Sequence, residues 1–79
     1  MNIAEATAKR ISELLLEKNK TQYRLQKETC LSEKTIRDIL HNRTKDINSS
    51  TVYLIASAFG LSLSEFYNSP LFNEENIEV

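Results

Sequence analysis

The chain has 79 residues, of which 41% are hydrophobic and 27% charged, and a formal net charge of −1. This length accommodates one domain, and the composition is that of an ordinary soluble globular protein. A single cysteine, Cys30, excludes an internal disulfide. The sequence has no apolar run of about 18 residues and no signal-peptide core at its start, so we expect no membrane span and a cytoplasmic location.

Charge is distributed unevenly along the chain. Residues 18–45 contain eight lysines and arginines against three acidic residues, a net charge of +5. Residues 46–79 contain five acidic residues and no basic one, a net charge of −5. A local cationic zone is suited to meeting a polyanion, whatever the total charge. On charge alone, a solvated helical surface explains the zone equally well.

The first predicted helix lies near the N-terminus. Asn2 is a good N-cap, Glu5 stands where a capping box needs an acid, and Asn19 closes the helix. Apolar side chains at three- and four-residue spacing form its inward stripe: Ala4, Ala8, Ile11, Leu14 and Leu15.

Two short helices follow, joined by a connection of three or four residues. Thr21 caps the second helix, in which Leu25 and Thr29 face inward. The third helix opens at Ser32, and its buried side comprises Ile36, Ile39 and Leu40. Neither helix is long enough to be stable alone, so both need support from neighbouring helices. Two short helices on a tight turn are typical of the helix-turn-helix.

The last two predicted helices carry clear start and stop signals. Asn48, Ser49 or Ser50 caps the fourth, Gly60 ends it, and Ser62 with Glu65 forms the capping box of the fifth. No segment alternates as a strand would, so we predict an all-α, compact five-helix bundle. Its predicted core is Ile11, Leu14, Leu15, Leu25, Ile36, Ile39, Leu40, Val52, Ile55, Ala56, Phe59, Leu61, Leu63 and Phe66.

The outer face of the third helix has the chemistry for reading bases. With Ile36 inward, helical geometry places four side chains outward, and Glu33 at the exposed N-terminal end. Arginine and lysine pair with guanine, and acidic side chains accept a hydrogen bond from cytosine N4. The four outward side chains are Lys34, Arg37, Asp38 and His41.

The stretch TQYRLQKETCLSEKTIRDILHNRTK (21–45), preceded by Ile11 and Leu14 and followed by TVYLIASAFGLSLSEF (51–66), resembles the lambda-repressor/Cro-like (Xre) family of regulators. The resemblance implies a lambda-repressor-like helix-turn-helix domain over residues 1–67, with 68–79 as an acidic C-terminal tail. It also implies a transcription regulator, expected to be a repressor, that binds double-stranded operator DNA as a homodimer. The recognition helix would be residues 32–41, placed in the major groove.

The site residues follow from this resemblance. Those expected to read bases are Ser32, Glu33, Lys34, Arg37 and Asp38. Those expected to hold phosphate are Gln22, which also braces the recognition helix, Asn42, Arg43, Thr44 and Lys45. Tyr23 is added to the phosphate contacts because it faces outward from the second helix, not because of the resemblance. We expect no catalytic residue, metal, cofactor or small-molecule ligand.

Three features depart from the family pattern. Cys30 stands at the turn position usually taken by glycine, where a left-handed backbone costs steric energy. Gln26 replaces the usual small residue where the second helix meets the third. Two acidic groups on the third helix would repel phosphate. We expect Cys30 to have a structural role as a small hydrophobe.

Two alternatives remain open at this level. A protein-interaction module that kept the bundle, or an antitoxin that also binds DNA, fits the same sequence. Apolar side chains off the main stripes, among them Leu16, Tyr53 and Leu54, suggest a covered surface. Either the tail, with Leu71 and Phe72, folds back onto Leu16 or Leu54, or this surface pairs with a second copy.

Overall fold

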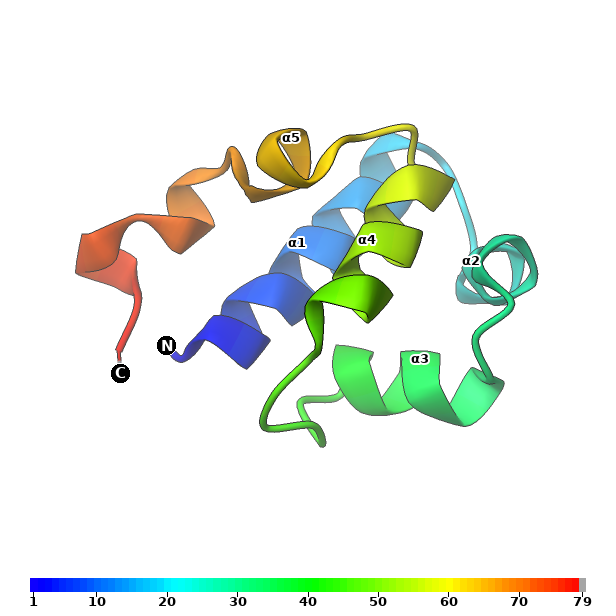
Figure 1. The fold of residues 1–79 in the computed structure, drawn as a ribbon, viewed down its shortest axis with the longest axis horizontal. Helices are drawn as coiled ribbons and strands as arrows, with labels where there is room; N and C mark the ends of the chain where they lie inside the picture. Colours follow the sequence, from blue (N-terminus) through cyan, green and yellow to red (C-terminus); the bar gives the residue numbers. More distant parts are fainter. Residues whose placement is uncertain (79) are drawn as a thin grey trace.

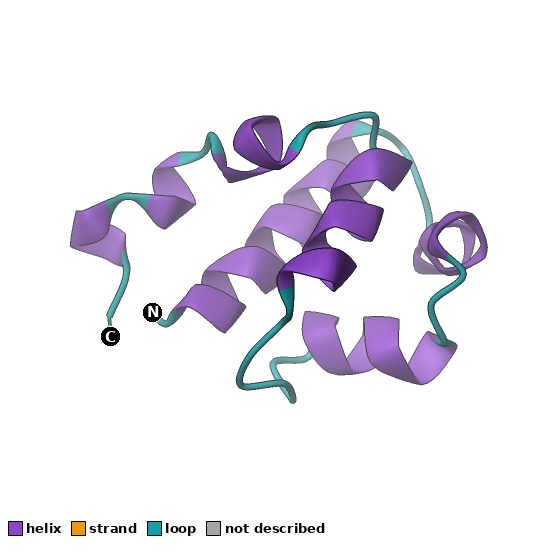
Figure 2. Cartoon of the chain, viewed as in Figure 1, coloured by secondary structure: helices purple, strands orange, loops and turns teal. Residues whose placement is uncertain are grey.

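The computed structural model describes residues 1–78 and shows five α-helices followed by two short 3-10 turns (Figure 1). No strand occurs in this range, which confirms the predicted all-α bundle (Figure 2). None of the helices described is long and apolar enough to cross a membrane. The elements are α1 (Ile3–Glu17), α2 (Gln22–Thr29), α3 (Glu33–Leu40), α4 (Ser49–Ala58), α5 (Leu63–Tyr67), η1 (Pro70–Phe72) and η2 (Glu74–Asn76).

The predicted N-caps are confirmed. Asn2 accepts from the backbone N–H of Glu5 at 2.8 Å, and the Glu5 carboxylate accepts from the Asn2 N–H at 3.1 Å. Ser62 and Glu65 form the second capping box. Of the three candidates for α4, Asn48 is the cap, and its side chain accepts from Thr51 N–H. Thr21 and Ser32 likewise cap α2 and α3.

Three helices end in the same hydrogen-bonded turn, each with a left-handed residue. After α4, Gly60 has φ +74°, and the N–H of Leu61 donates to the carbonyl of Ala56. Asn19 (φ 54°) and Asn42 (φ 59°) take the glycine position after α1 and α3, as asparagine tolerates this conformation better than most residues. Because this turn fixes the residue after it, the backbones of Lys20 and Arg43 are held in place.

Cys30 ends α2 with φ 59° and ψ 17°, so the left-handed backbone anticipated from the sequence is present. Cys30 is exposed, so it does not pack as a small hydrophobe; its structural role is in the backbone turn that ends α2. The left-handed turn carries the chain out of the helix at this residue. Thr29 fills the inward position before it, where its hydroxyl donates to the Leu25 carbonyl at 2.8 Å.

The core lies where α1, α2, α3, α4 and α5 meet. Ten of the fourteen predicted core residues are buried: Ile11, Leu14, Leu25, Ile36, Ile39, Val52, Ile55, Ala56, Phe59 and Phe66. The other four are only partly buried and pack against the edge of that cluster, so their assignment to the core was wrong: Leu15, Leu40, Leu61 and Leu63. A bundle of this size has too little interior to enclose every apolar side chain.

One contact holds α5 against α1, and a second holds the C-terminal segment, residues 68–78, against α5. Arg10 donates to the carbonyls of Phe66 (2.7 Å) and Glu65 (3.1 Å) at the end of α5, where a cation also suits the helix dipole. Phe72 in η1 lies edge-on to Tyr67, with ring centroids 4.9 Å apart. The elements α1 and η1 pack together, and α1 buries Ala6, which lies outside the predicted stripe.

The C-terminal segment ends beside the N-terminus (Figure 1). The Met1 ammonium lies 2.9 Å from a carboxylate oxygen of Glu78, and the Glu78 N–H donates to the Met1 carbonyl. The segment therefore folds back, but not onto either expected partner. Leu16 remains 85% exposed and Leu54 41% exposed.

Candidate nucleic-acid interface

The helix pair α2–α3 is held from behind by the rest of the bundle. The second helix packs on α4, the third packs on α1, and the two contact each other (Figure 1). Ile36 and Ile39 are the buried residues of α3. The opposite side of α3 is consequently available to a partner.

Four of the five predicted base-reading residues are exposed on α3 or at its start: Ser32, Glu33, Lys34 and Arg37. The Ser32 hydroxyl accepts from Thr35 N–H at 3.1 Å, so it is engaged as the cap of α3. Asp38 was predicted on the outward face, but its side chain is only 21% exposed. It points toward the loop after α3, where it lines a small hollow with Thr44 and Asp46.

The charged side chains of this face are paired with one another. Arg37 Nη1 lies 2.7 Å from Glu33 Oε1, and Lys34 Nζ lies 2.7 Å from Asp38 Oδ2. Arg43 Nη1 approaches the other oxygen of Asp38 at 3.8 Å. The hydrogen bond from Lys34, more than the charges around it, lowers the pKa of Asp38 below its usual range. Asp38 is therefore ionised at neutral pH with cations beside it.

The predicted phosphate-binding loop follows α3 directly. Asn42 provides its left-handed turn, and Arg43 N–H donates to the Asp38 carbonyl at 2.8 Å. Arg43 and Lys45 are exposed, as is Asn42, whereas Thr44 is half-buried. The loop thus presents two flexible cations from a backbone that is fixed at its start.

The two predicted phosphate contacts on α2 lie at its N-terminal end. Gln22 is the first residue of the helix and is half-buried, while Tyr23 is exposed. Lys27 lies one turn further along, with Nζ 5.3 Å from the centre of the Tyr23 ring. Sequence reasoning did not assign Lys27 a role, although its spacing of four residues from Tyr23 places both on one side of α2.

Lys20, just before α2, also received no role from the sequence. Its Nζ donates to Glu28 Oε1 at 2.7 Å and to the carbonyl of Ala58 at 2.6 Å, and it lies 5.7 Å from the centre of the Phe59 ring. The ion pair lowers the pKa of Glu28, chiefly through the hydrogen bond from Lys20. The start of α2, and with it Gln22, is thereby fixed relative to α4.

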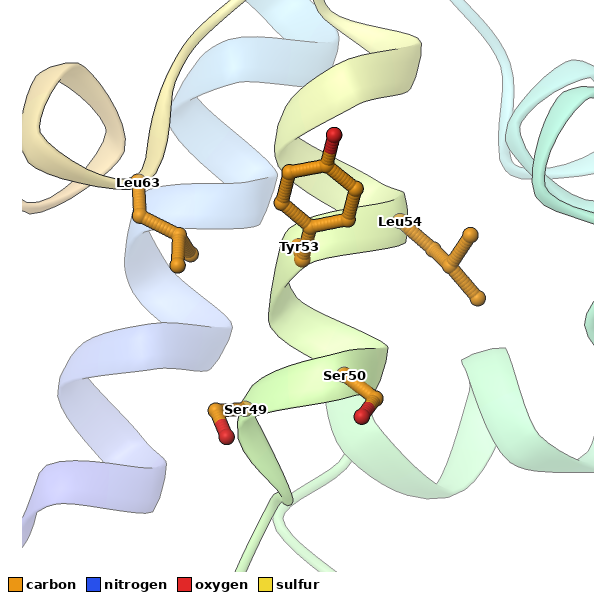
Figure 3. Close-up of a pocket in the computed structure, with 5 residues that line it drawn as sticks. All are labelled: Ser49, Ser50, Tyr53, Leu54 and Leu63. Carbon is orange, nitrogen blue, oxygen red and sulfur yellow. The ribbon is translucent and has the colours of Figure 1, made fainter.

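A second surface feature lies on the outer side of α4. An open, mostly apolar hollow of about 420 Å³ lies between α4 and the start of α5 (Figure 3). It is lined by the first turn of α4, by two exposed side chains further along α4, and by the first residue of α5. Tyr53 is 55% exposed and projects from α4 between Leu54 and Leu63 (Figure 3). The serines at one end are four and five residues beyond Lys45 in the chain. The lining residues are Ser49, Ser50, Tyr53, Leu54 and Leu63.

One of three comparisons with known proteins gives a match. A family model described as helix-turn-helix matches residues 11–66, which run from the middle of α1 to Phe66 in α5. Neither the curated proteins nor the solved structures give a significant match. The matched range includes every predicted base-reading and phosphate-binding residue.

Proposed function

The chain belongs to the helix-turn-helix family of the Xre/lambda-repressor type, a family of DNA-binding regulators, and from this premise we propose that it is a sequence-specific transcriptional repressor. Its recognition helix, residues 32–41, enters the major groove of operator DNA, which is wide enough for an α-helix.

The observation that carries this proposal is the division of α3 into two faces. Ile36 and Ile39 anchor it in the core, while Lys34 and Arg37 are exposed on the other side. A plain surface helix would carry similar charges, but it would not be the second member of a braced helix-turn-helix. These cations have the chemistry for hydrogen bonding to guanine O6 and N7.

Phosphate contacts orient the recognition helix on the duplex. Arg43 and Lys45 follow α3 on an exposed loop, and Gln22 and Tyr23 stand at the start of α2. We assign Asn42 and Thr44 to the same contact through their polar side chains. Two groups of contacts on either side of α3 in the sequence would grip the backbone and fix the register without reading sequence.

We further propose that the protein binds its operator as a homodimer through the hollow on α4 and α5. Tyr53, Leu54 and Leu63 provide the apolar surface, and no other part of residues 1–78 covers them fully. A two-fold dimer pairs a patch with its own copy and places two recognition helices about 34 Å apart, one turn of DNA. The site would then be close to palindromic.

Site selection from random duplex with the purified protein tests the function. We expect one enriched sequence with inverted symmetry, and binding that weakens linearly in log–log plots as salt rises. Sedimentation with the selected duplex should give two protomers per site. One protomer per site would reject the dimer while leaving DNA binding intact.

A protein-interaction module is the second candidate, favoured by the pairing of carboxylates with the cations on α3. It predicts no salt-dependent retention on duplex DNA. Retention that disappears when Arg43 and Lys45 are both changed to glutamine would exclude it, because only phosphate contacts give that dependence.

A further inference from the structure

The acidic residues of the recognition surface have no obvious place in binding a polyanion. We infer that the carboxylates of Glu33 and Asp38 determine specificity, by penalising every duplex that offers them no hydrogen-bond donor. This inference rests on the proposed function and names residues that set its selectivity.

Each carboxylate is paired with cations that the proposed function assigns to contacts with DNA. Glu33 holds Arg37 at 2.7 Å, and Asp38 holds Lys34 at 2.7 Å with Arg43 at 3.8 Å. Three of the cations assigned to bases or phosphate thus already share two carboxylates in the free protein. Lys45 forms none of the ion pairs found within residues 1–78.

Binding to an arbitrary duplex must break these pairs. A phosphate that takes Arg37 or Lys34 leaves the carboxylate without its partner and close to the DNA backbone, where like charges repel. The cost offsets part of the gain from counterion release, which otherwise dominates non-specific binding. Non-specific association is therefore expected to be weaker than it would be without the two carboxylates.

A cognate duplex removes this cost. In the major groove cytosine presents its N4 amino group and adenine its N6 amino group, and both donate to a carboxylate. Where such a donor faces Glu33 or Asp38, the carboxylate keeps a partner and the freed cation gains one. Discrimination arises from repulsion at wrong sites as well as attraction at the right one.

The two carboxylates differ in how firmly they are held. The Asp38 side chain is 21% exposed and lies between α3 and its following loop, while the Glu33 side chain is 59% exposed at the helix start. Glu33 can swing toward a base edge with little rearrangement. Asp38 holds a base-reading cation and a phosphate-binding cation together, so its release changes both kinds of contact.

The test compares Glu33→Gln and Asp38→Asn with the unchanged protein on two duplexes, one selected and one of random sequence. Glu13→Gln is the matched control, because Glu13 is exposed on α1 and forms none of the ion pairs found within residues 1–78. Thermal melting establishes that each variant is folded. A cycle of Asp38→Asn with Lys34→Gln on random duplex measures their coupling.

We expect each of the two α3 variants to bind random duplex about threefold to tenfold more tightly, with a salt slope steeper by about one. The preference for the selected site should fall, and Asp38→Asn should have a smaller effect once Lys34 is removed. Random-duplex affinity equal to that of Glu13→Gln would overturn the inference. So would equal tightening on both duplexes, since that preserves discrimination. If the unchanged protein itself showed no salt-dependent binding to either duplex, the proposed function would be rejected.

Discussion

Lys20 Nζ lies 2.6 Å from the carbonyl oxygen of Ala58, which joins the residue before α2 to the last turn of α4. The lysine backbone is held by the turn that ends α1, and its side chain is 19% exposed. This contact orients the start of α2 relative to α4.

Lys20→Met should lower the free energy of unfolding by about 1–2 kcal/mol, because the Ala58 carbonyl loses a charged donor in a poorly hydrated place. Urea unfolding measures this change. Lys9→Met, at an exposed position of α1, is the control and should change stability little. Equal stability of the two variants would show that the contact does not hold α2.

Cys30→Gly should raise the free energy of unfolding by about 0.5–1 kcal/mol. Glycine adopts φ 59° without steric cost, and we expect this gain to exceed the stability lost because glycine makes the unfolded chain more flexible. Cys30→Ala keeps a Cβ and removes the thiol, so its stability should match that of the original protein. Chemical denaturation of all three proteins distinguishes backbone strain from a role of the sulfur. If the glycine variant were no more stable than the alanine variant, the left-handed backbone at residue 30 would not be strained.

Phe72→Ala should release the C-terminal segment, because the Phe72 ring contacts both Phe66 and Tyr67. We expect a loss of about 1–2 kcal/mol, as the side chain is half-buried. Amide exchange at Glu78, whose N–H donates to Met1, should become faster. Tyr23→Ala removes an exposed ring and should leave that amide protected.

Phosphate and base contacts should respond differently to substitution. Arg43→Gln or Lys45→Gln should weaken binding to all duplexes and flatten the salt slope by about one per lost contact. Arg37→Ala should relax base preference at one position by about 1–3 kcal/mol. Repeating site selection with each variant checks the assignment. An unchanged selected sequence for Arg37→Ala would remove that residue from base reading.

Acid should destabilise the fold partly through Glu65. The backbone N–H of Ser62 donates to this carboxylate and lowers its pKa below the usual 4.5. The unfolded chain therefore binds a proton more readily, so this contribution is present above the usual pKa and is lost as pH falls through the folded one. Glu65→Gln should weaken the dependence of stability on pH below about 5. An unaltered pH profile would show that the cap does not contribute.

The sequence by itself determined the local features. Caps at Asn2, Thr21, Ser32 and Ser62 depend on hydrogen bonds that span three residues, so their signals are complete within one turn. The left-handed backbone at Cys30 was expected from the family resemblance, in which glycine usually takes that turn position. Apolar spacing determined five helices and ten of the buried side chains.

Tertiary structure decided what depends on distant residues. Asp38 is half-buried because the loop after α3 returns over it. Leu15 and Leu40 lie at the rim because a small bundle encloses few positions. Phe72 packs on Phe66 of α5, and the Glu78 carboxylate pairs with the Met1 ammonium at the other end of the chain. No periodicity within one segment encodes such contacts, since each depends on how whole helices are arranged in space.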